Sequence, residues 1–173
     1  GASELLACAR LPPGLGFGQG FQGGVAKKVF VAVARTPGGG TVPALRRAGE
    51  AKPPTLQIEE YSHYGMVARL SAGAANLPFW PLRNYAGTDI PKANPLIKTV
   101  DCPYTGEKLA TVPALRPAVT IVHAQRADKR GKVQHSGLMG VQQEVAFAPK
   151  RVNAVVEVLG EKSVLTHAPN RQP

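Results

Sequence analysis

Two adjacent carboxylates stand where a short strand is expected to end and a helix to begin. They are Glu59 and Glu60, in the run I-E-E-Y-S-H of residues 58–63. In open α/β sheets this end of a strand faces the ligand crevice. A partly buried carboxylate there has its pKa raised and can act as a general acid or base. Adjacent strand residues point to opposite faces, so we expect one of the two to face the site. The alternative is that both complement the dipole of the following helix, worth up to about 1 kcal/mol.

Ser62 and His63 extend this group toward the helix. A serine here is a favourable N-cap, and that structural role is its simplest interpretation. A histidine has an ordinary pKa near 6.5 and can share protons with a carboxylate, although a structural role is the alternative. We place both among the expected substrate-binding residues.

Two further polar groups are expected to contribute to substrate binding. The first is Gly87-Thr88-Asp89, where glycine allows close backbone approach and the other two can bind a hydroxyl or carboxylate. Its alternative is a local turn stabilised by the aspartate. The second is His123 with Gln125, at the end of an expected central strand. An equally good interpretation is that these two side chains hold loops together through buried hydrogen bonds.

Gly18, Gly20 and Gly23 match the spacing G-x-G-x-x-G but lack the context of a dinucleotide site. Such a site needs a strand before the glycines and a helix after them. Here a Pro-Pro turn precedes them and a β-branched run follows. We therefore expect no dinucleotide binding, and we interpret residues 1–24 as a flexible lead-in to one domain over residues 25–173.

The elements that must position these residues alternate between strands and helices, which predicts an α/β fold with an open, largely parallel sheet and flanking helices. Residues 83–103 carry prolines and glycines without a clear period and are expected to form a long loop. A turn into a short strand is expected over 131–133. The expected strands are 29–34, 56–60, 111–112, 119–122 and 152–158, and the expected helices are 42–49, 63–75 and 138–148.

Composition excludes several classes of protein. The chain has 173 residues, 43% of them hydrophobic, which suits one globular domain. Its net charge is +10, but the cations are scattered in pairs without interleaved aromatic residues, so nucleic acid is not the expected partner. No apolar run approaches the roughly 20 residues that span a bilayer, so no membrane association is expected. Cys8 and Cys102 lie far apart, which favours a reduced, cytoplasmic compartment without a disulfide or a metal site.

Several blocks resemble the α subunit of family I coenzyme A transferases, the group that includes the glutaconate enzyme. They are I-E-E-Y-S-H-Y-G-M-V-A-R-L from residue 58, Y-A-G-T-D-I-P from residue 85 and V-P-A-L-R-P-A-V-T-I-V-H-A-Q-R-A-D-K-R-G from residue 112. The runs S-H-Y-G-M-V-A-R and N-P-L-I-K-T-V-D-C-P-Y-T-G-E-K-L are similar to a narrower branch. That branch is the α subunit of actinobacterial hydrolases that open the last steroid ring as a CoA thioester. Relative to the family, the chain is expected to be trimmed at both ends.

The resemblance implies an enzyme subunit that works with a β subunit on an acyl-CoA thioester. Coenzyme A would enter as part of the substrate, with no permanently bound cofactor. The glutamate that forms a thioester with CoA in this family belongs to the β subunit, and its motif is absent here. In the ring-opening branch a glutamate of the α subunit handles protons, and Glu59 and Glu60 stand in the matching block. Hydrolytic ring opening in cholesterol catabolism is thus the expected reaction. The alternatives are CoA transfer between carboxylic acids and a non-catalytic module that binds a partner.

Overall fold

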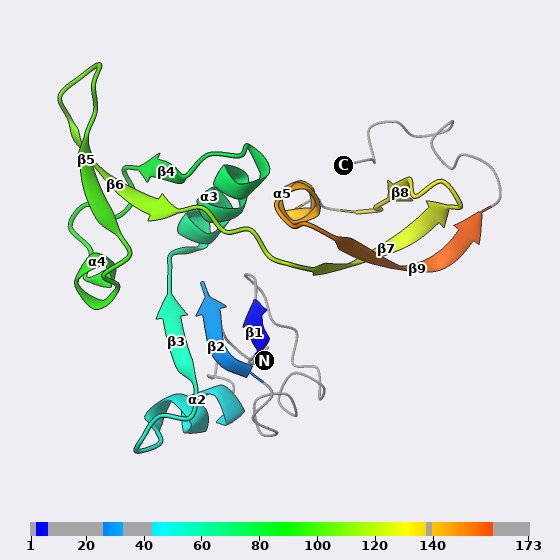
Figure 1. Cartoon of the computed structure of the whole chain (residues 1–173), viewed down its shortest axis with the longest axis horizontal. Helices are drawn as coiled ribbons and strands as arrows, with labels where there is room; N and C mark the ends of the chain where they lie inside the picture. Colours follow the sequence, from blue (N-terminus) through cyan, green and yellow to red (C-terminus); the bar gives the residue numbers. More distant parts are fainter. Residues whose placement is uncertain (1–2, 7–25, 33–42, 138–139, 161–173) are drawn as a thin grey trace. The chain divides into compact units, whose positions relative to one another are not determined.

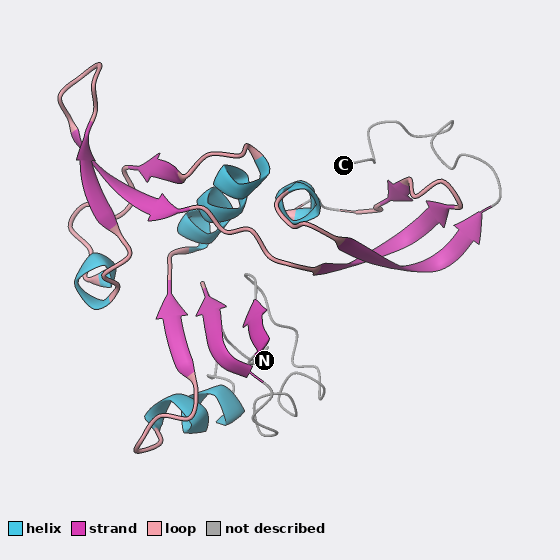
Figure 2. Ribbon diagram, viewed as in Figure 1, coloured by secondary structure: helices cyan, strands magenta, loops and turns pink. Residues whose placement is uncertain are grey.

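The computed structural model describes residues 3–6, 26–32, 43–137 and 140–160 (Figure 1). The chain divides into two compact units, Gly1–Ala68 with Pro81–Val112 and Arg69–Trp80 with Pro113–Pro173. Among the described residues the strands form three sheets of three strands each (Figure 2). None of the described helices is long and apolar enough to cross a membrane. The three glycines Gly18, Gly20 and Gly23 lie outside the described residues.

The first sheet has the strand order β1-β2-β3 and is parallel throughout. Strand β1 (Ser3–Leu6) lies within the expected lead-in, and β2 (Ala26–Val31) and β3 (Gln57–Glu60) follow the expected strands. Helix α2 (Pro43–Glu50) connects β2 to β3 and confirms the helix expected over 42–49. Its proline occupies the first helical position, where a missing N–H costs nothing. The register pairs Phe30 with Glu59 and Val31 with Glu60, so both carboxylates lie at the carboxyl end of the sheet.

Helix α3 (His63–Ala74) confirms the helix expected from residue 63. Ser62 caps it, because its Oγ accepts the Gly65 N–H at 3.0 Å. The apolar stripe that predicted the helix includes Met66 and Leu70, each 1% exposed. The chain leaves the helix through Asn76, whose φ of 58° lies in the left-handed region that ends many helices. The pattern of caps and apolar positions is therefore sufficient to place this element.

The second sheet has the order β4-β6-β5 and differs from expectation. Its strands are β4 (Phe79–Leu82), β5 (Lys98–Asp101) and β6 (Lys108–Pro113), with β5 and β6 antiparallel. The expected loop over 83–103 instead contains helix α4 (Ile90–Ala93) and β5. The expectation was wrong because β5 is only four residues long, K-T-V-D, which is too short to show a period, and its pairing with β6 stabilises it. Thr111 and Val112 lie in a strand, as expected: they belong to β6, the middle strand of this sheet, which runs antiparallel to β5.

The third sheet has the order β8-β7-β9. Strands β7 (Thr120–Asp128) and β9 (Val152–Gly160) pair in parallel, as expected for an α/β fold, while β8 (Val133–Gln134) is antiparallel to β7. Helix α5 (Gln142–Phe147) lies within the range expected to be helical, which also includes undescribed residues 138–139. The β-branched runs thus predicted β7 and β9, and the turn at Gly131 leads into β8 as expected.

Candidate functional site

The two carboxylates at the end of β3 have opposite environments. The side chain of Glu59 is buried at 9% exposure, whereas Glu60 is exposed. In this strand the apolar residue faces outward and the charged one inward: Ile58 is 41% exposed, and the next residue is the buried glutamate. The structure therefore separates a buried carboxylate from an accessible one, a distinction that the sequence left open.

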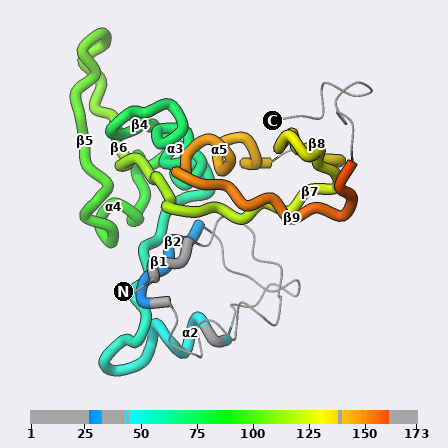
Figure 3. The backbone as a smooth tube through the Cα atoms, turned by 45° about the vertical axis from the view of Figure 1, so that its right-hand side comes forward, coloured from blue at the N-terminus to red at the C-terminus, as the bar shows by residue number. Residues whose placement is uncertain are grey.

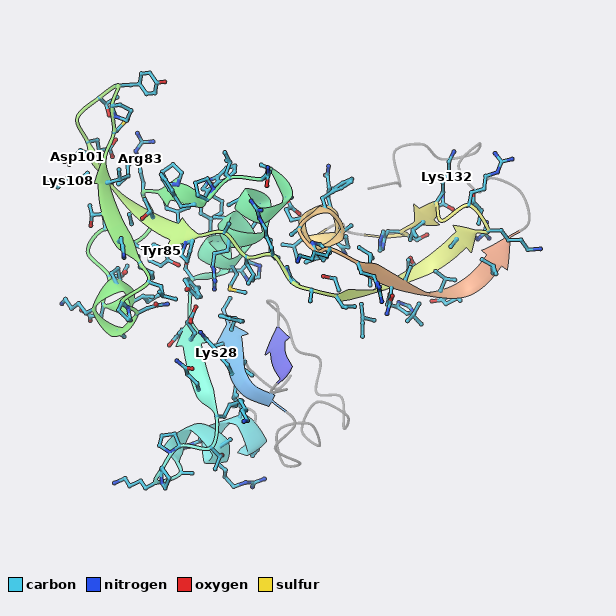
Figure 4. All side chains as sticks on the ribbon, viewed as in Figure 1. Lys28, Arg83, Tyr85, Asp101, Lys108 and Lys132 are labelled. Atoms are coloured by element: carbon cyan, nitrogen blue, oxygen red, sulfur yellow. The ribbon has the colours of Figure 1, made fainter. Side chains whose placement is uncertain are left out.

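Glu59 is held by two neighbours that its sequence context does not reveal. Its Oε2 lies 2.8 Å from the Lys28 ammonium of β2, and its Oε1 accepts the Tyr61 hydroxyl at 2.5 Å. Lys28 also lies 4.9 Å from the centre of the Phe30 ring. Figure 4 labels Lys28 beside the carboxyl end of the first sheet. A buried charge with an ion-pair partner and a charge-assisted hydrogen bond is stabilised in its ionised form. Lys28 and Phe30 are two residues apart in β2 and therefore lie on the same face of the strand as Glu59, which pairs with Phe30. This spacing is the sequence feature that could have indicated the cluster.

Ser62 and Tyr85 connect the turn after β3 to the chain that follows β4. The Ser62 N–H donates to the Tyr85 hydroxyl oxygen at 3.1 Å, and the Asn84 amide donates to Ser62 Oγ at 2.7 Å. Tyr85 is 3% exposed. Nearby, the Asn94 amide donates to the backbone oxygen of Glu60 at 2.9 Å. Ser62 thus has the capping role that was its simplest interpretation, and no sequence signal pointed to Tyr85 or Asn94 as partners.

His63 is exposed at the first position of α3. The structure brings His63 and Glu60 into the same turn, as their sequence positions require. The acidic Glu60 and the imidazole of His63 are both accessible at the carboxyl end of the parallel sheet. A carboxylate and an imidazole in this place can exchange protons with a bound ligand.

The Gly87-Thr88-Asp89 segment forms a turn whose polar groups are engaged locally. The Thr88 hydroxyl and its N–H both donate to the Tyr85 carbonyl, at 3.0 and 3.2 Å. Asp89 forms an exposed ion pair with Lys92 at 2.7 Å. Gly87 has a φ of 75°, which explains the need for glycine in this turn.

An open pocket of about 210 Å³ lies beside this turn. Tyr85, Ala86 and Pro91 contribute to its lining, and residues 87–89 do not. Its charged lining residues are Arg83, Lys98, Glu107 and Lys108. The geometry therefore supports the local-turn interpretation of Thr88 and Asp89. The pocket is lined by residues on either side of this turn and not by the turn itself.

His123 and Gln125 belong to the other compact unit. They lie within β7 and not at its end as expected, because the strand continues through Asp128. His123 is exposed, with Nε2 3.9 Å from a Glu157 carboxylate oxygen. Gln125 accepts the Ser136 N–H at 2.8 Å and so ties β7 to the segment after β8. That bond matches the loop-holding role considered for Gln125.

His135 is a buried histidine that no sequence motif singled out, and it is 7% exposed. Burial, and to a lesser degree the neighbouring His123, lower the pKa of His135. Among the described residues no group of three or more His, Cys, Asp or Glu side chains is placed to hold a metal ion.

Residues 17–170 match the coenzyme A transferase family. The chain belongs to this family. It is 45% identical over 153 residues to the A-subunit of the 3-oxoadipate CoA-transferase of Pseudomonas knackmussii, a match that covers 88% of this chain and 54% of the relative. It is 29% identical over 132 residues to the cholesterol ring-cleaving hydrolase IpdA subunit of Rhodococcus jostii, covering 72% of this chain and 43% of that relative.

A solved structure of the decarboxylase AibA/AibB superposes with a TM-score of 0.77 at 30% identity, over 93% of this chain and 60% of that chain. This similarity confirms the expected α/β fold class, and the family assignment confirms the resemblance seen in the sequence. The chain spans about half the length of the curated relatives that it matches.

Proposed function

We propose that this coenzyme A transferase family chain contributes the α subunit of a heteromeric enzyme that moves CoA from an acyl-CoA thioester to a free carboxylic acid. The observation that carries the proposal is the 45% identity over 153 residues to the A-subunit of a 3-oxoadipate CoA-transferase. A second, β subunit would supply the glutamate that takes up CoA. Coenzyme A would be present as part of the substrate, without a permanently bound cofactor.

Hydrolytic ring opening of a steroid-derived thioester is the second candidate. The 29% identity to the cholesterol ring-cleaving IpdA subunit favours it. The sequence blocks favour this reaction, but the similarity to the transferase relative is higher and covers more of the chain. Transfer of CoA is therefore the better-supported reaction.

Within this site we propose that Glu60, with His63 beside it, is the carboxylate that meets the substrate, and that Glu59 positions the turn. Glu60 is exposed at the carboxyl end of β3, where ligands of open α/β sheets bind. Glu59 already neutralises Lys28 and accepts the Tyr61 hydroxyl, so its oxygens are committed to the fold. Ser62, Gly87, Thr88, Asp89, His123 and Gln125 remain proposed contributors to substrate binding.

The reaction is tested by co-expressing the chain with a candidate β subunit of the same family and supplying an acyl-CoA thioester together with 3-oxoadipate as the free acceptor acid. A transferase consumes the thioester only when the acceptor acid is present, and it forms the acceptor thioester. Release of free CoA without the acceptor would contradict transfer. Ring-opening hydrolysis breaks a carbon–carbon bond and retains the thioester, so it is tested separately with a cyclic acyl-CoA: a product that has gained one water with CoA still attached, detected by mass spectrometry, would support the second candidate. Failure of both reactions in a stable complex would favour the non-catalytic module.

The glutamate pair gives a matched comparison. We expect Glu60→Gln to lower the turnover of the assembled enzyme by about 10²–10⁴-fold, as the loss of a general acid or base does, with little change in melting temperature. Glu59→Gln removes a buried charge opposite Lys28 and is expected to destabilise the fold by about 1–3 kcal/mol. Thermal melts and initial rates of both variants decide between the roles. Near wild-type turnover in Glu60→Gln would contradict its assignment.

A further inference from the structure

The turn between β5 and β6 presents a tyrosine that contacts almost nothing in the described structure. Tyr104 is 93% exposed, the highest value among the large hydrophobic side chains that the structure describes. Figures 1 and 3 show β5 and β6 as neighbouring strands joined by this turn. An aromatic side chain gains free energy chiefly by leaving water. At this exposure the ring buries little apolar area within the described structure, so nearly all of its surface is available to a contact with another molecule.

The turn is ordered before any partner binds. The Cys102 N–H donates to the Glu107 carbonyl and the Gly106 N–H to the Cys102 carbonyl, both at 2.8 Å. Gly106 has a φ of 71°, a conformation that glycine adopts without strain. Hydrogen bonds from the Thr105 side chain, and then from the backbone of Tyr104 and Thr105, lower the pKa of the Cys102 thiol. A preorganised turn loses little conformational entropy on docking, so more of the contact free energy contributes to affinity.

Charges on both sides of the turn are neutralised within the same unit. Lys108 lies 2.9 Å from Asp101, and Arg83 lies 2.7 Å from Glu107. Figure 4 labels Arg83, Asp101 and Lys108 together at this hairpin. The turn itself, residues 103–106, carries no charge. Recognition at this turn is therefore aromatic and not ionic. The surface that fits it has an apolar recess with a polar atom for the phenol hydroxyl.

We propose that residues 103–106 form a docking element that inserts Tyr104 into an apolar recess of the second subunit of the heteromer. The inference rests on the proposed function, in which this chain works with a β subunit. The relatives support this occupant, since one is named as the A-subunit of its enzyme and the superposed structure is the pair AibA/AibB. Tyrosine is one of the three residue types, with tryptophan and arginine, that are enriched among the residues that dominate the affinity of protein interfaces.

The test measures the affinity of the full chain for a candidate β subunit of the same family by isothermal titration calorimetry. Tyr104→Ala is expected to raise the dissociation constant by about 10- to 100-fold. Tyr104→Phe keeps the ring and is expected to lose less. Phe147→Ala, which removes another exposed aromatic side chain, is the matched control and is expected to bind as the wild type does. Because Tyr104 is almost fully exposed, the melting temperature of the isolated chain should not change.

Each other outcome contradicts the proposal in a distinguishable way. Equal affinity of the wild type and Tyr104→Ala would overturn the docking role and leave the proposed function intact. Absence of any complex with the wild type would overturn both. If Tyr104→Ala instead abolishes self-association of the chain alone in analytical ultracentrifugation, the occupant is a second copy. If it lowers the melting temperature of the chain alone, the turn is covered by the same polypeptide.

Discussion

Glu59 and Glu60 differ by one position and yet have different prospects as catalytic groups. The buried Glu59 has an ammonium and a phenol as partners, while Glu60 faces solvent. A buried carboxylate with such partners keeps its charge and its position, which suits it to hold a turn. An accessible carboxylate can instead approach a substrate. The chemistry at this site thus depends on side-chain environment and not on residue type.

His135 is expected to make stability depend on pH. Burial and His123 lower its pKa, so below its ordinary pKa of about 6.5 the unfolded chain binds more protons than the folded chain. Its contribution to stability is complete above about pH 6.5 and is lost as the pH falls through the folded-state pKa. Urea unfolding should therefore show a larger loss of stability from about pH 7 to about pH 5 in the wild type than in His135→Gln. His123→Gln, as the control, should retain most of that loss, and parallel wild-type and His135→Gln profiles would refute the assignment.

At the scale of elements, the start of α3 is fixed by contacts on several sides. Ser62 caps the helix, and the Tyr85 hydroxyl accepts the Ser62 N–H. A methyl group added at Gly65 would overlap that hydroxyl oxygen. In an ordinary helix, glycine to alanine stabilises by about 1 kcal/mol. Here the close contact with Tyr85 makes the same substitution destabilising.

We expect Gly65→Ala to destabilise the protein by about 1–3 kcal/mol, because it forces Tyr85 away from the helix. Tyr85→Phe removes the overlapping oxygen, so the glycine substitution should cost less in the Tyr85→Phe background. Chemical denaturation of the two single variants and the double variant gives this coupling directly. If the free-energy changes of the two single variants simply add in the double variant, the contact between residue 65 and the Tyr85 hydroxyl is not the cause of the destabilisation.

At the scale of the whole molecule, β9 carries apolar side chains that the described structure leaves exposed. Val155 is 54% and Leu159 is 61% exposed, and the two lie on one face of an edge strand. Exposed apolar edge strands promote association between chains. The isolated chain is therefore expected to self-associate through this strand.

Val155→Lys combined with Leu159→Lys should reduce light scattering and dye binding of the isolated chain without lowering its melting temperature. Lysines on an edge strand oppose strand pairing between molecules. Val156→Lys is the matched control, since Val156 is half-buried and pairs with the fully buried Ala124. It should destabilise the chain. Unchanged scattering in the double variant would show that association uses another surface.

The sequence by itself determined the elements that depend on neighbouring residues. The apolar stripe and the Ser62 cap predicted α3, the early proline predicted α2, and β-branched runs predicted β2, β7 and β9. Its motifs also indicated the family, because they preserve residue order over most of the chain. These features depend on neighbouring residues or on the order of motifs along the chain, so they can be recognised without knowing the tertiary contacts.

Only the tertiary structure decided which groups face one another. The burial of Glu59 against Lys28, the bond from Ser62 to Tyr85 and the pairing of β5 with β6 join residues that are distant in the sequence or lie in separate strands. Register sets these contacts, and a shift by one residue would exchange the faces of a strand. The identity of the accessible carboxylate follows from that register, which no local pattern in this chain specifies. The exposure of Tyr104 follows from its place in the turn that joins the paired strands β5 and β6.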